Sequence, residues 1–146
     1  VQNSFWFFDQ QELGRIRVDA QLRKLANTGR LDQLLGITPA PTAMQEFDSR
    51  LYVNDPSTGI LVFDLFGTYM KTIPLKEVRS FEVRSGYLYF VQGGLPQVYD
   101  MRSFAIDAIP LPESLLVGLI AFRIERGRAY VLTPSGIVIH EAVGRP

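Results

Sequence analysis

Five charged residues recur on short apolar segments of the sequence, and their types suit either cation binding or ion pairing. They are Glu46, Glu82, Arg84, Arg123 and Glu125. A ring of such groups around a channel could hold a cation or a small polar ligand, and hard cations require several oxygen ligands with surplus negative charge. Because two arginines lie among the carboxylates, we favour an ion pair between Glu82 and Arg123. A second pair between Arg84 and Glu125 follows from the same argument.

A second set of polar residues lies in turns, where side chains can meet a ligand. Asp55, Ser57 and Gln92 stand beside glycine- and proline-rich turns, and Thr133-Pro134-Ser135 forms a similar turn. Loops of this kind often carry function. An aspartate at the end of a strand also bonds the backbone of the following turn. Five aspartates recur at equivalent positions of the repeat: Asp9, Asp19, Asp55, Asp64 and Asp100. A binding site is expected once in a chain and not in every repeat, so we favour the structural role for these aspartates.

Groups for covalent, redox or metal chemistry are scarce. The sequence has no cysteine and one histidine, His140, so disulfides and thiolate metal sites are excluded. His140 occupies the repeat position of Phe63 and Tyr99, which favours a packing role. No glycine-rich phosphate loop or nucleophile motif is present. We therefore assign no catalytic residue, no metal ligand and no cofactor.

The elements that position these residues form a repeat of about 40 residues. The segment 50–55 is followed by strands at 59–64 and 70–75, and the same order returns at 87–91, 97–100 and 106–111. A further strand precedes each later unit, at 43–47, 80–84 and 121–125. Short strands rich in valine, isoleucine and aromatic residues, repeating at this period, indicate β-propeller blades. The predicted fold class is therefore all-β, with blades of four-stranded antiparallel sheets in an incomplete ring.

The repeat predicts a single partial propeller domain over residues 1–146. Its blade units cover approximately 1–28, 43–76, 79–112 and 119–146, with an inner strand lacking in the first and an outer strand in the last. Unpaired edge strands recruit other strands. We therefore expect either a piece of a longer propeller or completion by a protein partner or by self-association. In the longer connection at 29–42, Leu31, Leu34 and Leu35 could give one helical turn before the two prolines force an extended exit.

The best-formed unit resembles the NHL-type repeat of six-bladed propellers. Tyr52-Val53-Asn54-Asp55, then Val62-Phe63-Asp64, Gly67 and Thr72-Ile73 follow the order of that motif. The match is good over residues 50–75, partial over 4–25 and 87–111, and weak over 128–144. The Trp-Asp dipeptide of WD40 blades is absent. The resemblance implies a six-bladed ring, in families that include protein-binding modules, RNA-binding modules and hydrolases.

The composition of the chain limits the kinds of partner that it is expected to bind. Fifteen basic and fifteen acidic residues balance to a net charge of zero, which gives no electrostatic case for nucleic acid. The longest apolar run, residues 115–122, is far shorter than the roughly 20 residues of a membrane span. No signal peptide is visible in this sequence, and the compartment stays open, with a secreted or periplasmic location among the alternatives. The aromatic run Phe5-Trp6-Phe7-Phe8 favours a strand covered on both faces over an exposed recognition patch.

Two functions remain after these exclusions. The first is a non-catalytic scaffold or binding module that acts through rim loops or within a larger assembly. Its candidate residues are the channel and rim groups Glu46, Glu82, Arg84, Arg123, Glu125, Asp55, Ser57 and Gln92. The alternative is a fragment of a calcium-dependent propeller hydrolase or lactonase, which the six-bladed resemblance and the carboxylates on inner strands suggest.

Overall fold

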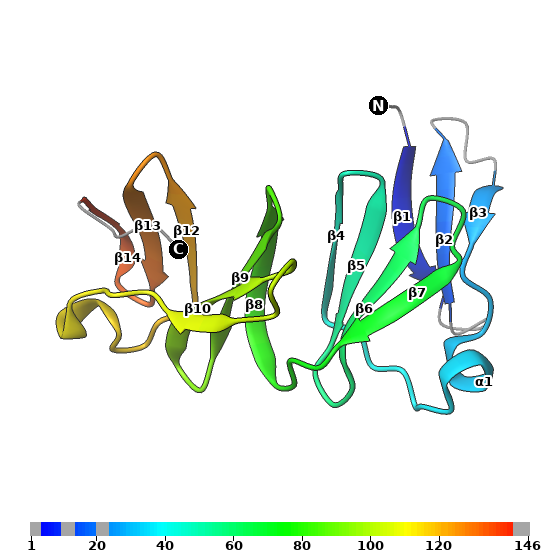
Figure 1. Cartoon of the computed structure of the whole chain (residues 1–146), viewed down its shortest axis with the longest axis horizontal. Coiled ribbons are helices and arrows are strands. Elements are labelled where there is room, and N and C mark those ends of the chain that lie inside the picture. The colour runs from blue at the N-terminus through cyan, green and yellow to red at the C-terminus, as the bar shows by residue number, and fades with distance from the viewer. Residues whose placement is uncertain (1–3, 10–13, 20–23, 142–146) are drawn as a thin grey trace. The chain divides into compact units, whose positions relative to one another are not determined.

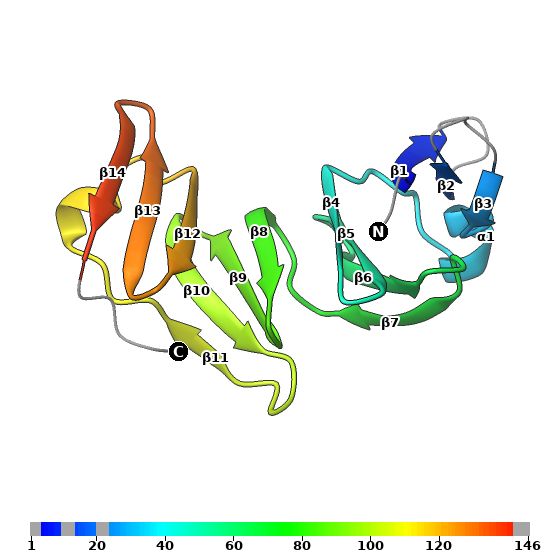
Figure 2. The same cartoon turned by 90° about the horizontal axis from the view of Figure 1, so that it is seen from above.

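The computed structural model describes residues 4–9, 14–19 and 24–141. These residues form two compact units, 1–76 and 77–146, and each is described here by itself. The described residues are built from antiparallel sheets, drawn in Figures 1 and 2. The prediction of an all-β fold resembling a partial propeller is confirmed. The prediction that residues 1–146 are one domain stays a prediction.

The first unit holds two sheets joined by a long connection. One has the order β1-β2-β3 and the other β4-β5-β6-β7. The connection contains α1, a single turn over Leu31–Leu35 as predicted, which ends at Gly36 in the left-handed conformation. The strands are β1 (Ser4–Asp9), β2 (Gly14–Asp19), β3 (Lys24–Asn27), β4 (Ala43–Phe47), β5 (Arg50–Asp55), β6 (Gly59–Asp64) and β7 (Tyr69–Ile73).

The second unit repeats this plan. Its sheets have the orders β8-β9-β10-β11 and β12-β13-β14, and a 3-10 turn, η1 (Glu113–Leu115), lies in the connection between them. The strands are β8 (Val78–Arg84), β9 (Tyr87–Gln92), β10 (Leu95–Asp100), β11 (Ile106–Ala108), β12 (Ala121–Glu125), β13 (Arg128–Thr133) and β14 (Gly136–His140).

Hairpins of one geometry join the first two strands of three sheets. Two-residue turns, Asp48-Ser49, Ser85-Gly86 and Arg126-Gly127, connect the strands, and every turn residue has a positive φ. Turns of this kind match the right-handed twist of the strands that they connect. Because the turns are alike, the repeat keeps its register from sheet to sheet. Corresponding side chains therefore reach corresponding places.

Two outer strands end earlier than the apolar pattern predicts. The strand expected at 70–75 ends at Ile73, and the one expected at 106–111 ends at Ala108. Pro74 and Pro110 lie just beyond these ends, and proline has no N–H with which to continue a ladder. The apolar residues that follow still pack inward, since Leu75 and Ile109 are buried.

Each unit has its own apolar core between its two sheets. In the first unit Trp6 packs with Leu31 of α1 and with residues of β5 and β6, Leu51, Val53, Leu61 and Phe63. In the second, β9 and β10 pack against β12 and β13 through Tyr89, Val91, Val98, Phe122, Ala129 and Val131. Tyr89 and Phe122 meet edge to face, with ring centroids 6.3 Å apart. The sheets of each unit thus pack face to face, as neighbouring blades do.

Candidate functional site

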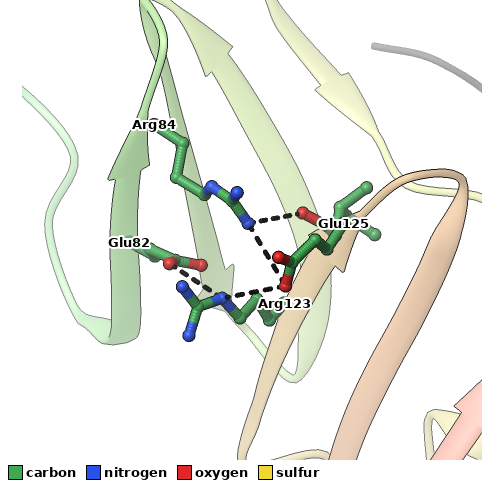
Figure 3. A network of polar contacts seen from close by, with 5 residues as sticks. Glu82, Arg84, Arg123 and Glu125 are labelled. Atoms are coloured by element: carbon green, nitrogen blue, oxygen red, sulfur yellow. Dashed lines mark hydrogen bonds and ion pairs between the residues drawn. The ribbon is translucent and has the colours of Figure 1, made fainter.

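Strands β8 and β12 bring four of the predicted site residues together (Figure 3). Arg123 Nε lies 3.2 Å from Glu82 Oε2, and Arg84 Nη1 lies 3.9 Å from Glu125 Oε1. Both predicted ion pairs are therefore confirmed. Arg123 Nε also lies 3.9 Å from Glu125 Oε1, so the four charges form a network. Arg84 donates a further hydrogen bond of 3.0 Å to the carbonyl of Ile124.

Glu82 is the most enclosed member of this network. Its side chain is 20% exposed. Burial raises the pKa of Glu82, because it disfavours the charged carboxylate; Arg123 and Arg84 partly offset this, and Glu125 adds to it. The network thus holds a carboxylate whose negative charge is costly. Two guanidinium groups beside it leave no surplus of negative charge for a cation.

The raised pKa of Glu82 predicts a particular pH dependence for Glu82→Gln. Because burial raises the pKa of Glu82 above its usual value of 4.5, the folded state holds the carboxyl proton at pH values where the unfolded state has released it. The stability that this proton confers is therefore lost as pH rises through the folded pKa. Relative to the unmodified chain, the variant should therefore be more stable at about pH 7 than at about pH 4. Urea unfolding of both proteins at the two pH values measures the difference. A change of opposite sign would mean that the ion pairs outweigh burial.

Glu46, the fifth predicted channel residue, lies in the first unit. Its Oε1 accepts a hydrogen bond of 3.1 Å from Trp6 Nε1, which links β4 to β1. Trp6 belongs to the core of this unit. A buried indole needs an acceptor for its N–H, so Glu46 satisfies the polar end of a core residue.

Asp55 is a buried anchor. It is 1% exposed, and its carboxylate accepts hydrogen bonds from the Ala40 N–H at 2.9 Å and the Ser57 hydroxyl at 3.3 Å. The first bond fixes the end of the long connection onto β5. Thr42 continues this attachment by donating its N–H to the Asn54 carbonyl at 2.9 Å. Asp55 was predicted to bond the backbone of the following turn; its carboxylate instead bonds the backbone of the preceding connection at Ala40 and the side chain of Ser57 in that turn.

A buried arginine accompanies Asp55. Arg15 on β2 is 4% exposed and lies over the Phe8 ring, 4.8 Å from its centroid. Burial lowers the pKa of Arg15 to about 10, and the negative charge of Asp55 acts in the opposite direction. Arg15 is not among the site residues predicted from the sequence. The sequence feature that could have identified it is a charged residue in β2 at the repeat position where β6 has the apolar Ile60.

Other repeated aspartates also bind turns. Asp64 accepts from the N–H groups of Phe66 and Thr68, at 2.8 and 2.9 Å. Asp100 accepts from those of Arg102 and Ser103, at 2.8 and 3.2 Å, and these bonds lower its pKa. Their repetition reflects one turn chemistry used in two sheets. Ser57 is exposed in its turn, and Gln92 accepts a hydrogen bond at its carbonyl from the Gln97 amide.

A hollow in the second unit lies at the rim opposite to the turn beside Gln92. It measures about 390 Å³ and is lined by Arg84, Ser85, Tyr87, Tyr89, Ile124, Glu125 and Arg126. A second hollow of about 300 Å³ shares Glu125 and Arg126 with it and adds Arg128 and Tyr130. Sequence reasoning missed Tyr87, Tyr89 and Arg126. The sequence feature that could have pointed to this hollow is Arg126, a long charged residue that precedes glycine in a hairpin turn.

The described residues hold no cluster of three or more histidine, cysteine, aspartate or glutamate side chains suited to a metal ion. Within the same residues, no helix has the length and apolar character that crossing a membrane requires.

Comparison with known proteins supports the fold. No family model matches the sequence, and no curated protein matches it. Among solved structures, the computationally designed Ika4 protein aligns with a TM-score of 0.63 and 10% identity, over 97% of this chain and 86% of Ika4. Designed Ika8 aligns with a TM-score of 0.63 and 9% identity, over 97% of this chain and 44% of Ika8. The N-terminal domain of Nup159 aligns with a TM-score of 0.55 and 11% identity, over 100% of this chain and 43% of that domain.

These structural similarities show a propeller-like architecture, and at this level of identity they support no statement about function. The chain spans less than half of the Ika8 and Nup159 chains that it matches.

Proposed function

We propose that this chain is a β-propeller scaffold or binding module that holds a protein partner at one rim. Its strand order and its NHL-like repeat favour a place in a six-bladed ring. The observation that carries the proposal is the arginine- and tyrosine-lined hollow between β8–β9 and β12.

The walls of the hollow are held by the ion-pair network. Arg84 is bonded to the Ile124 carbonyl and lies beside Glu125, while Tyr89 packs on Phe122. Side chains fixed before binding lose little further freedom when a partner arrives. Arginine and tyrosine are enriched at the centres of protein interfaces. A protein segment that presents a carboxylate next to an apolar side chain suits such a lining.

The repeated carboxylates support the same proposal. Asp64 and Asp100 bind turn backbone, Asp55 binds the backbone of the long connection at Ala40, and Glu82 pairs with Arg123. These groups therefore shape and support the rims. Arg84 and Arg123 bring positive charge to Glu82 and Glu125, which disfavours the calcium-dependent alternative.

Capture from an extract of the source organism tests the proposal. The immobilised chain should retain a specific partner, and the double variant Tyr87→Ala, Arg126→Glu should lose at least about tenfold of it, because both side chains line the hollow. Quantitative mass spectrometry of the retained proteins measures this loss.

The matched control is Gln92→Ala, at the opposite rim of the same unit. It should retain the partner at the level of the unmodified chain. If Gln92→Ala loses the partner while the double variant keeps it, contact occurs through the β9–β10 turn and the proposed surface is wrong.

A further inference from the structure

Neighbouring sheets within each unit meet through two different faces. We call the face that meets the next sheet along the chain the forward face, and the opposite one the backward face. In the second unit the forward face of β8–β11 presents Tyr89, Val91 and Val98. It packs on the backward face of β12–β14, which presents Phe122, Ala129 and Val131. The contact is apolar on both sides.

The first unit uses the same pair of faces. Trp6 lies on the forward face of β1–β3 and packs against Leu51, Val53, Leu61 and Phe63. In the repeat, Leu51 and Val53 correspond to Ala129 and Val131, and Trp6 corresponds to Tyr89. A forward face against a backward face is thus the contact that this chain forms twice.

The forward face of the last sheet, β12–β14, is exposed. On this face Tyr130 is paired with Ile139, and Leu132 with Ile137. The equivalent pairs in β9 and β10 are Tyr89 with Val98, and Val91 with Pro96. Yet Leu132, Ile137 and Ile139 are 38%, 71% and 56% exposed, whereas Val91 and Val98 are 1% and 2% exposed. A contiguous apolar patch of this kind marks an interaction surface.

Strand β14 also differs from its sequence counterpart. Gly136–His140 aligns without gaps with Gly59–Phe63 of β6. Ile60, Leu61, Val62 and Phe63 are each 0% exposed. Among the described residues β6 pairs with strands on both edges, and β14 pairs with β13 alone. The same apolar pattern is therefore buried in one sheet and bare in the other.

The first sheet offers a face of the opposite type. Phe7 alternates with Trp6 along β1, which places it on the backward face of β1–β3. Phe7 is 41% exposed. The aromatic run is thus covered at Trp6 and open at Phe7, which departs from the expectation of a strand covered on both faces. One chain carries a bare forward face and an exposed aromatic residue on a backward face.

We propose that the bare forward face of β12–β14 binds the backward face of β1–β3 of a second copy of this chain. The contact would continue, between copies, the apolar interface that the chain already forms twice. It joins two different surfaces, so each of two copies contributes one face to each of two equivalent junctions. This inference rests on the proposed propeller function and names one partner of that module.

Sedimentation equilibrium of the 146-residue chain tests the proposal. The mass should be twice 16.5 kDa. Ile137→Lys should yield the monomer mass, because a lysine would place its charge in an apolar contact. The matched control is Val117→Lys, at an equally exposed residue of the same unit, 77% against 71%. It should remain a dimer, and far-ultraviolet circular dichroism should show both variants folded.

A mixing experiment identifies the second face. Phe7→Lys should also yield monomers. An equimolar mixture of Phe7→Lys and Ile137→Lys should regain dimers, since one of the two junctions then has both surfaces intact. Pairing of two β14 edges predicts a different result, in which Phe7→Lys stays dimeric and mixing restores nothing.

A monomeric unmodified chain would overturn the proposal, as would a dimer that Phe7→Lys leaves unchanged. Neither result depends on Tyr87 or Arg126. Failure of this inference is therefore distinguishable from failure of the proposed rim function, which the capture experiment measures separately.

Discussion

Gly67→Ala is expected to lower the free energy of unfolding by about 3 kcal/mol or more. Gly67 has a φ of +86°, and an added Cβ would overlap the Asn27 carbonyl group and lie 2.8 Å from the Thr28 nitrogen. These atoms belong to the backbone at the end of β3, so rotation of a side chain cannot relieve the overlap. The turn itself is fixed by Asp64, which accepts from Phe66 and Thr68. Urea unfolding followed by tryptophan fluorescence measures the loss through Trp6.

Gly36→Ala is the matched control for this prediction. Gly36 has a φ of +65°, and nothing lies within 4 Å of an added Cβ. Its cost should be limited to the left-handed backbone conformation, about 1 kcal/mol. Equal losses for the two variants would show that the contact of Gly67 with residues 27–28 contributes nothing.

Asp55→Ala is the second change with a large expected effect, a loss of about 3 kcal/mol. The carboxylate is 1% exposed and accepts hydrogen bonds from Ala40 and Ser57. It also supplies the negative charge that opposes the lowering of the pKa of Arg15, a residue 4% exposed. Its removal would leave the buried Arg15 cation without this opposing charge, and the Ala40 N–H without its acceptor. The free energy of unfolding in urea measures the cost.

Two further variants separate charge from hydrogen bonding. Asp55→Asn retains a side-chain oxygen that accepts hydrogen bonds, so it should cost less than Asp55→Ala. In an Arg15→Leu background, Asp55→Asn should cost less than in the unmodified chain, since the cation is absent. An unchanged cost in that background would show that Asp55 acts through the Ala40 bond alone.

The repeated strands and their turns could be predicted from the amino-acid sequence. Alternation and turn chemistry are local properties, so Arg50–Asp55, Gly59–Asp64 and Ala121–Glu125 were predicted with the bounds that the structure shows. The pairing of Glu82 with Arg123 was also predictable. It follows from register, because residues at equivalent positions of adjacent blades face one another.

Which apolar strands are buried could not be predicted in this way, because burial depends on tertiary packing. Val62 and Ile139 occupy equivalent positions in similar sequences, yet they are 0% and 56% exposed. Burial depends on what packs against a strand, and no property of the strand itself specifies that. The same reason applies to Arg15, whose enclosure comes from packing around β2, and to the hollow at Tyr87 and Arg126. Local sequence sets the register of each sheet, and the neighbouring surfaces decide which of its faces remain free to bind.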